Sequence, residues 1–472
     1  MSKSVKKIVK NSFFQTFGSF GASGLQFALT VRYATLLGPA HYGSLNTSLA
    51  QVTIWSLLVD LGLSNGLIGA LTAAQGEKSE LARQGFRSRD LLARVLFIRL
   101  AGAFIGSAVV FFFAWLHASS QGQFSTEQFH QDIAYTPFLF ALAMQQTAIA
   151  YSSFRGRQGL AVFSMLSGIF CSVSSAIFLA WKGYAITWLL LAQSWGGFLT
   201  TAILFSVFAL QKAALPEAAE STRRLEKKRR GPWGGEAWRA LGQDAWPYAI
   251  TFAAAVLWQR LDQIVASRFL GMESAGQYAL AVRLVAIPVL IATSISFAAF
   301  PDLQRIGRDA PEKIIPYLGA VSKFLYRYGI FLAALMLFGV AALVGPLVPK
   351  FGPALHLLPW FIPGIWAFWI HSFIVNALFA FRRYWAVVNA HLVALAAYLV
   401  MLPILAKLFG LPGVAWGCNV FPLVLLFVCL LRLRETELVG ERFSLFAKFT
   451  ETEIELLQKV GEKFIPRGLL RR

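Results

Sequence analysis

The stretch that decides the fold runs from Trp385 to Arg434 and reads WAVVNAHLVALAAYLVMLPILAKLFGLPGVAWGCNVFPLVLLFVCLLRLR. Between Trp385 and Leu431 its only Asp, Glu, Lys or Arg residue is Lys407. A transmembrane helix needs about 20 mainly apolar residues, so this stretch is long enough for two. We expect one span over 384–407 and another over 411–432. The sequence therefore predicts an integral membrane protein.

The composition of the whole chain agrees with these two spans. Hydrophobic residues make up 57% of the 472 residues and charged residues 14%, whereas an average soluble domain is about 45–50% apolar and about 25% charged. A net charge of +20 would suggest a nucleic-acid partner for a soluble protein. Here the basic residues gather in particular loops, so membrane topology explains them and we expect no nucleic-acid partner.

Further apolar runs predict an all-α integral membrane fold with about twelve transmembrane helices. The expected spans are 12–37, 42–73, 91–116, 132–154, 159–181, 185–211, 244–270, 274–300, 318–346, 353–379, 384–407 and 411–432. With the N-terminus inside, the outward loops hold only Lys182, Lys350 and Lys407, and the inward loops hold nearly all other basic residues. The positive-inside rule thus predicts that both termini lie in the cytoplasm.

The spans divide into two groups of six. We expect an N-terminal lobe over 1–211, a basic cytoplasmic linker over 212–243, a C-terminal lobe over 244–432 and an amphipathic cytoplasmic tail over 433–472, where apolar and charged residues alternate. The linker carries a cluster of six basic residues: Arg223, Arg224, Lys227, Lys228, Arg229 and Arg230. A partner-binding patch is one interpretation of it, and we favour a solvated linker near anionic lipid headgroups.

A glycine pattern indicates that the two lobes are repeats. Gly38 and Gly43 stand at the turn between the first and second expected spans, and Gly271 and Gly276 stand at the turn between the seventh and eighth, each 233 positions later (38 to 271). Because six is an even number, both halves enter the membrane in the same direction. The sequence therefore predicts a parallel pseudo-twofold repeat, an arrangement common in transporters that rock around a site between their lobes.

Six charged residues lie at depth within the expected spans: Arg32, Asp60, Arg99, Arg260, Asp262 and Arg283. A charge at the bilayer centre costs about 2.5–3.5 kcal/mol on insertion scales, so a water-filled cavity between the lobes is the simplest location for them. This cavity would have an excess of positive charge, which suits an anionic substrate, since guanidinium groups bind phosphate through paired hydrogen bonds. The residues that would supply the charge are Arg32, Arg99, Arg260 and Arg283. Asp60 and Asp262 are candidate coupling acids, and Gln259 and Gln263 are polar neighbours.

Structural interpretations of the same residues stay open. Arg260 and Asp262 could form a structural pair, Asp60 could support a hydrogen-bond network, and Arg99 could anchor its helix at the interface. A small polar stripe on the fifth span, made of Ser164, Ser167, Cys171 and Ser174, is more typical of a helix-packing seam than of a substrate contact. The scattered histidines His356, His371 and His391 do not predict a metal site, and we expect no cofactor, although coupling to an H⁺ or Na⁺ gradient stays open.

Several segments together resemble one family of transporters. They are Arg32-Tyr33-Ala34-Thr35-Leu36-Leu37-Gly38-Pro39-Ala40-His41-Tyr42-Gly43, Asp60-Leu61-Gly62-Leu63-Ser64, Arg260-Leu261-Asp262-Gln263, Phe269-Leu270-Gly271, Gly276-Gln277-Tyr278-Ala279-Leu280-Ala281 and Phe300-Pro301-Asp302-Leu303. They resemble the polysaccharide-lipid flippases of O-antigen, capsule and exopolysaccharide pathways (Wzx-type), which belong to the multidrug, oligosaccharidyl-lipid and polysaccharide exporter superfamily.

The resemblance implies a twelve-helix, two-lobed carrier that moves undecaprenyl-pyrophosphate-linked oligosaccharide from the cytoplasmic to the outer leaflet. Its cationic cavity would correspond to Arg32, Arg260 and Arg283 here, with Arg99 as a further candidate. The implied partners are the lipid-linked oligosaccharide, membrane lipids and polysaccharide polymerase machinery. Two alternatives stay open: a multidrug or small-molecule exporter of the same superfamily, and a membrane polysaccharide polymerase or ligase. The outward loop over 117–131 is too short to fold as a catalytic domain, so we expect no enzyme.

Overall fold

The computed structural model describes residues 3–60, 63, 88–119, 126–155, 157–213, 235–309, 314–381, 383–434, 445, 450, 451 and 454. The basic cluster of the linker and nearly all of the expected tail lie outside these residues.

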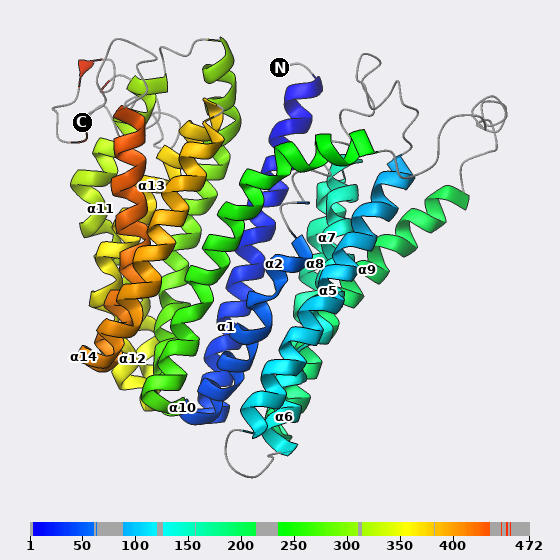
Figure 1. The fold of residues 1–472 in the computed structure, drawn as a ribbon, viewed down its shortest axis with the longest axis vertical. Coiled ribbons are helices and arrows are strands. Elements are labelled where there is room, and N and C mark those ends of the chain that lie inside the picture. Colours follow the sequence, from blue (N-terminus) through cyan, green and yellow to red (C-terminus); the bar gives the residue numbers. More distant parts are fainter. Residues whose placement is uncertain are drawn as a thin grey trace, which may run out of the picture. The chain divides into compact units, whose positions relative to one another are not determined.

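The N-terminal half contains α1 (Lys3–Ile54), α2 (Ser56–Asp60), α5 (Ser88–Ser119), α6 (Thr126–Ile133), α7 (Pro137–Phe154), α8 (Gln158–Trp181) and α9 (Ile186–Ala213). The C-terminal half contains α10 (Gly235–Asp309), α11 (Ile314–Val344), the short 3₁₀ turns η3 (Gly345–Leu347) and η4 (Pro349–Phe351), α12 (Gly352–His356), α13 (Leu358–Ala380) and α14 (Tyr384–Arg434) (Figure 1).

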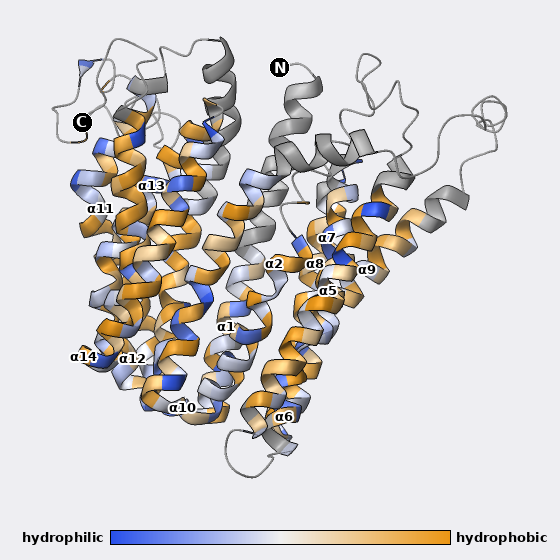
Figure 2. Cartoon of the chain, in the orientation of Figure 1, coloured by the Kyte–Doolittle hydropathy of each residue, from blue (hydrophilic) through white to orange (hydrophobic). Residues whose placement is uncertain are grey.

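Eight helical stretches of the described residues are long and apolar enough to cross a membrane, and Figure 2 shows hydrophobic residues along most of these helices. Two of them, Trp246–Ile291 and Tyr384–Leu433, have 46 and 50 residues, which is about twice the length of one crossing. They reverse direction at Gly271 and Gly410, so the eight stretches make ten crossings. The two arms of α1 occupy the first two expected spans, of which the second is described to Asp60 and at Leu63.

Backbone geometry confirms the repeat that the glycine pairs predict. Gly38 reverses α1 with φ 71° and ψ 172°, and Gly271 reverses α10 with φ 85° and ψ 170°. This region of backbone space is essentially restricted to glycine, because a Cβ atom would clash there. Glycine therefore stands at both turns for the same steric reason, and the two lobes begin with the same helical reversal.

The turns between α7 and α8 and between α13 and α14 also match, at an offset of 226 positions (157 to 383). The backbone N–H groups of Arg157 and Arg383 each donate to the carbonyl oxygen five residues earlier at 2.9 Å. The carbonyl oxygens of the same two residues each accept from the N–H three residues later at 3.1 Å. The two halves therefore share the backbone hydrogen bonding of this turn.

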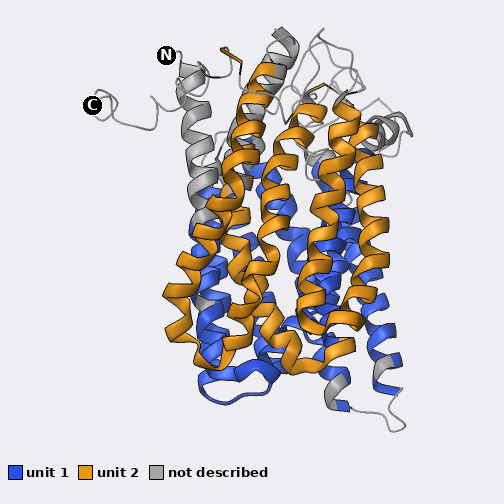
Figure 3. Ribbon diagram, turned by 90° about the vertical axis from the view of Figure 1, so that its left-hand side faces the viewer, with its two compact units in different colours: residues 1–267 blue, residues 268–472 orange. Residues whose placement is uncertain are grey.

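The chain divides into two compact units, residues 1–267 and 268–472, called here the N-terminal and C-terminal units (Figure 3). Within the N-terminal unit, α8 packs against α1 and α9, and α5 packs against α2 and α7. Within the C-terminal unit, α13 packs against both α11 and α14. The boundary falls inside α10, so the expected seventh span, 244–270, lies mostly in the N-terminal unit. Division at the 212–243 linker stays a prediction.

Candidate functional site

Arg99 is the most deeply enclosed of the charged residues that the sequence analysis selected. It lies on α5, seven residues after Leu92, where the apolar stretch begins, or about 10 Å along the helix axis. Its exposed fraction is 0% and it is among the largest fully buried side chains of the described residues. A guanidinium in this position needs acceptors from neighbouring helices, because burying an uncompensated charge is costly.

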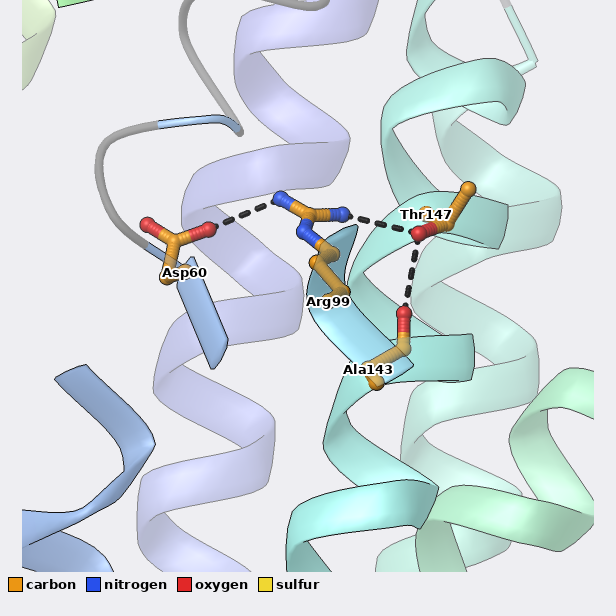
Figure 4. A network of polar contacts seen from close by, with 4 residues as sticks. All are labelled: Asp60, Arg99, Ala143 and Thr147. Carbon is orange, nitrogen blue, oxygen red and sulfur yellow. Dashed lines mark hydrogen bonds and ion pairs between the residues drawn. The ribbon is translucent and has the colours of Figure 1, made fainter. Parts of the chain in front are cut away.

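Two neighbouring helices supply those acceptors (Figure 4). The Nη2 atom of Arg99 donates to Oδ1 of Asp60 at 2.8 Å, and Nη1 donates to Oγ1 of Thr147 at 3.0 Å. The Thr147 hydroxyl in turn donates to the carbonyl oxygen of Ala143, one turn earlier on α7, at 2.9 Å. The planar guanidinium thus joins α2, α5 and α7, with each amino group directed to a different helix.

A glycine allows α2 and α5 to approach closely enough for this contact. Gly102 lies three residues after Arg99, and a Cβ atom there would collide with the backbone carbonyl group of Leu58. Gly106, one turn further along α5, would bring a Cβ atom to 3.2 Å from Cβ of Trp55. The missing side chains let the α2 backbone lie against α5, which brings Asp60 within reach of Arg99.

The pairing changes the charge balance within the membrane helices. Asp60 has a side-chain exposure of 13% and Arg99 of 0%, so the two opposite charges largely neutralise each other inside the N-terminal unit. The sequence analysis assigned them to separate roles, Arg99 to substrate binding and Asp60 to coupling, and both roles stay predictions. In this conformation the Arg99 side chain has no exposed surface to offer a substrate.

The predicted polar and charged residues on the first arm of α10 form a stripe that passes from the surface to the interior. Gln259 is exposed and Arg260 is half-buried, whereas Asp262 is 2% exposed and Gln263 is 7% exposed. The backbone N–H of Gln263 donates to Oδ1 of Asp262 at 2.7 Å. The basic residue of this stripe is therefore more accessible than the acidic one.

The other two predicted arginines, Arg32 and Arg283, lie on the first arm of α1 and on the second arm of α10. Arg32 is exposed on the first arm of α1, six residues before Gly38, or about 9 Å along the helix from the turn. Arg283 is half-buried on the second arm of α10, twelve residues after Gly271, or about 18 Å from that turn. Arg260 lies eleven residues before the same glycine, so Arg260 and Arg283 have similar depths along their own arms.

The small polar stripe on α8 packs as a seam, although on a slightly different face from the predicted one. Ser164 is fully buried and its carbonyl oxygen accepts from the hydroxyl of Thr200 on α9 at 3.2 Å. A Cβ atom on Gly196 would lie 2.7 Å from the Gly168 carbonyl oxygen. Cys171, by contrast, is exposed. The two helices meet along Ser164, Gly168 and Ser172, which are spaced by four residues.

Three hydrogen bonds that join helices of the C-terminal unit are made by neutral polar groups. The Asn376 amide nitrogen donates to Oγ of Ser296 at 2.7 Å, and Nε1 of Trp369 donates to the carbonyl oxygen of Pro288 at 3.0 Å. The Asn419 amide nitrogen donates to the carbonyl oxygen of Trp360 at 2.5 Å. These contacts link α13 to the second arm of α10 and to α14 without charged groups.

The buried basic residue Lys323 was not among the residues identified from the sequence. Lys323 is 4% exposed and lies on α11, seven residues after the apolar stretch begins at Pro316. Arg99 lies at the same distance from the start of its own stretch, so the third span of each half buries a basic side chain at this position. The criterion that selected Arg99, a charge inside an apolar run, would also have selected Lys323.

Comparisons with solved structures identify the fold. The lipid II flippase MurJ in an inward closed conformation matches with a TM-score of 0.62 and 14% identity, covering 97% of this chain and 100% of that one. A eukaryotic MATE transporter also gives 0.62 and 14%, covering 97% and 99%. A MATE transporter of Vibrio cholerae gives 0.57 and 16%, covering 92% and 98%. At these identities the likeness shows a shared two-lobed, twelve-helix fold.

Sequence comparison identifies the family. No curated protein sequence matches the chain. The family model described as "Polysaccharide biosynthesis protein" matches residues 8–306, which include the Arg99–Asp60 pair and nearly all of α1 and α10. This match confirms the resemblance drawn from the motifs around Gly38 and Gly271. The chain therefore belongs to the polysaccharide biosynthesis protein family.

Proposed function

We propose that the protein is a flippase for oligosaccharide linked through pyrophosphate to undecaprenol, moving it from the cytoplasmic to the outer leaflet. The observation that carries this proposal is the sign of the accessible charge within the membrane helices. Asp60 is matched by Arg99 and Asp262 is 2% exposed, whereas Arg32 is exposed and Arg260 and Arg283 are half-buried. The accessible charge is therefore positive, as an anionic headgroup requires.

The proposed mechanism uses these arginines as successive contacts for the pyrophosphate. Guanidinium groups bind phosphate oxygens through paired hydrogen bonds, and the arginines lie at different depths along their helices. The glycan passes through a hydrated path while the prenyl chain stays in the lipid, and the two halves of the repeat alternate between inward and outward access. No catalytic group or cofactor is required. The protein acts in a bacterial inner membrane with both termini in the cytoplasm, and Asp60 and Asp262 are the candidate acids for ion coupling.

The test is flipping of a fluorescent undecaprenyl-pyrophosphate oligosaccharide in proteoliposomes containing the full chain. Arg260→Gln and Arg283→Gln should each slow flipping about tenfold, because a charge-assisted hydrogen bond contributes about 1.5–3 kcal/mol. Arg260→Lys, which keeps the charge, should retain more activity. Arg268→Gln is the matched control, since Arg268 is exposed near the outer turn of the same helix. Unchanged flipping in both glutamine variants, at equal protein levels, contradicts the proposal.

A second candidate function is export of drugs or other small molecules, which the fold shared with MATE transporters favours. The same proteoliposomes distinguish the two functions when they are supplied with cationic dyes. Dye export that is unaffected by the sugar lipid, together with an absence of sugar-lipid flipping, would favour the exporter. Competition between dye and sugar lipid with dependence on Arg260 would favour the flippase.

A further inference from the structure

The exposed face of α11 carries an arginine at the depth of the membrane interior. Arg327 is exposed and lies eleven residues after Pro316, where the apolar stretch begins, or about 16 Å along the helix axis. The hydrocarbon core of a bilayer is about 30 Å thick, so the backbone of Arg327 lies near the middle of the core. Charged residues at this depth are rare and commonly mark functional sites.

Contacts with α13 determine which face of α11 is exposed. The rings of Tyr326 and Trp366 have centroids 5.6 Å apart, and Nε1 of Trp366 donates to the carbonyl oxygen of Tyr326 at 3.2 Å. A Cβ atom on Gly329 would lie 3.0 Å from Cδ1 of Trp366, so glycine allows the two helices to approach closely here. Because Tyr326 and Gly329 face α13, Arg327 and Tyr328 lie on the sides of α11 that are left exposed.

The third span of the other half, α5, has a closely similar exposed face. Each helix carries three phenylalanines at intervals of seven residues, and the second set lies 227 positions after the first (97 to 324). All six side chains are between 39% and 69% exposed: Phe97, Phe104 and Phe111 on α5, and Phe324, Phe331 and Phe338 on α11. Residues seven apart lie on one face of a helix, and a continuous row of exposed aromatic rings is typical of a surface that contacts lipid. We therefore infer that this face of α11 contacts lipid.

The two faces differ between the first and second phenylalanines. In the register of the phenylalanines, Leu100 and Ala101 on α5 correspond to Arg327 and Tyr328 on α11. Residues 100–119 of α5 contain no Asp, Glu, Lys or Arg. The face of α11 thus presents a guanidinium and a phenol hydroxyl at a level where the face of α5 is apolar.

The position and charge of Arg327 suit an anion that a lipid carries. Side chains of a helix tilt toward its N-terminus, so Arg327 extends toward Pro316, which is the cytoplasmic end of α11 in the predicted orientation. The five expected spans between 274 and 432 contain no Asp or Glu. The carboxylates on the second arm of α10 lie outside its expected span, and they belong to Glu273, Asp302 and Asp309. Phosphate is the anion of membrane lipids, and guanidinium groups bind it through paired hydrogen bonds.

We propose that Arg327 is the centre of a binding site for the phosphate group of a membrane lipid, on the exposed face of α11 and toward the cytoplasmic leaflet. Phe324 and Phe331, three residues before and four residues after it, are its neighbours on the helix surface and contact the hydrocarbon chain. Tyr328, whose ring centroid lies 5.2 Å from that of Phe324, adds a hydroxyl donor. The phosphate belongs to an anionic phospholipid or to a polyprenyl pyrophosphate. The second source makes the site an entry point for the substrate and rests on the proposed function, whereas phosphate binding itself does not.

The first test is native mass spectrometry of the full chain with added phosphatidylglycerol or undecaprenyl pyrophosphate. Arg327→Leu gives α11 the residue that α5 has at this level and should weaken lipid binding about tenfold, because it removes charge-assisted hydrogen bonds. The variant also removes a charge from the membrane interior, so it should fold at least as well as the unmodified chain. Arg327→Lys should give intermediate binding, and Lys350→Gln, which removes an exposed basic residue outside α11, should leave binding unchanged.

The two lipids identify the source of the phosphate. Tighter binding of undecaprenyl pyrophosphate supports an entry site for the substrate, whereas equal binding of both lipids supports a phosphate site occupied by phospholipid. Binding of both lipids that is the same in Arg327→Leu and in the unmodified chain overturns the proposal.

The second test uses the unmodified chain in nanodiscs and a phosphatidylglycerol with a photoreactive diazirine beside its phosphate group. Cross-links mapped by peptide mass spectrometry should be several-fold more frequent in residues 324–331 of α11 than in residues 97–104 of α5. The α5 segment is the internal control, because it has the same exposed phenylalanines without the exposed arginine. Equal labelling of the two segments overturns the proposal. Neither test uses transport, so failure of the flipping assay would contradict the proposed function alone.

Discussion

Two homologous regions, the interior of the N-terminal unit around Arg99 and the interior of the C-terminal unit around Asn376, hold their helices together by different chemistry. In the first, an ion pair with a 2.8 Å contact joins α2 to α5, and a 3.0 Å hydrogen bond extends it to α7. In the second, neutral amide, hydroxyl and indole groups join α13 to α10 and α14. The turns at Gly38 and Gly271 nevertheless share one geometry.

The difference teaches that two halves with the same backbone turn can join their helices through different polar contacts. The different contacts also predict different effects of mutations on stability. A buried ion pair contributes little net stability, but losing one partner leaves an uncompensated charge. A neutral interhelical hydrogen bond in a membrane averages about 0.6 kcal/mol and reaches about 1.7 kcal/mol. We therefore expect the N-terminal unit to be sensitive to single changes and the C-terminal unit to tolerate them.

The largest expected effect is that of removing one partner of the ion pair. Asp60→Ala leaves the fully buried guanidinium of Arg99 without its carboxylate and should destabilise the protein by about 3–5 kcal/mol. The measurement is the denaturation midpoint of the purified protein in detergent, together with the amount inserted in the membrane.

The double variant Asp60→Leu with Arg99→Met is the control for this prediction. Replacing both charges with apolar groups of similar volume should restore most of the stability, because it removes the desolvation cost with the attraction. A double variant as unstable as Asp60→Ala would show that the pair supports the fold in another way. A stable double variant that no longer flips lipid would assign the pair to transport.

An intermediate effect is expected at the two matched turns. Gly38→Ala and Gly271→Ala each force a Cβ atom into backbone space reserved for glycine, which costs about 1–3 kcal/mol. Because the two conformations agree, the two losses in denaturation free energy should be equal within error. Gly24→Ala is the control, since a Cβ atom there meets no atom within 4 Å and Gly24 is helical and exposed. Unequal losses in denaturation free energy would mean that the side chains around each turn, rather than the shared backbone conformation, determine the cost of the substitution.

The smallest effect is expected in the C-terminal unit. Asn376→Ala removes the hydrogen bonds to Oγ and to the carbonyl oxygen of Ser296, at 2.7 and 3.3 Å, and should cost about 0.6–1.7 kcal/mol. Ser296→Ala removes one of the two acceptors and should cost less. The same denaturation assay measures both variants. A loss for Asn376→Ala as large as that for Asp60→Ala would remove the contrast between the two units.

The sequence predicted what depends on local properties. The length of the apolar runs predicted the spans. The spacing from Gly38 to Gly271 predicted the repeat, because a helix reversal with positive φ restricts the residue at that position to glycine. The analysis also selected Arg99 and Asp60, since a charge in an apolar run is visible without any structure.

The sequence did not predict which of these residues meet. Asp60 and Arg99 are 39 positions apart on helices whose rotation about their axes is set by packing, and Gly102 decides that packing by admitting the Leu58 backbone. The same reason explains the α8 seam, where the contact between Gly168 and Gly196 turned the buried face toward Ser172 and left Cys171 exposed. Opposite charges near the inner ends of consecutive spans were the available signal for the ion pair.

The reversal at Gly271 has a consequence for the biogenesis of the protein. Because the two arms of α10 are joined by a single residue, neither can enter the bilayer without drawing the other after it, and we expect them to insert together as a helical hairpin. In the orientation predicted from the loop charges, the tip of this hairpin crosses the membrane. It carries Arg268 and Glu273, whose opposite charges limit its net charge and hence the electrostatic cost of crossing. We therefore expect the short turn at Gly271 to couple the membrane insertion of the two arms of α10.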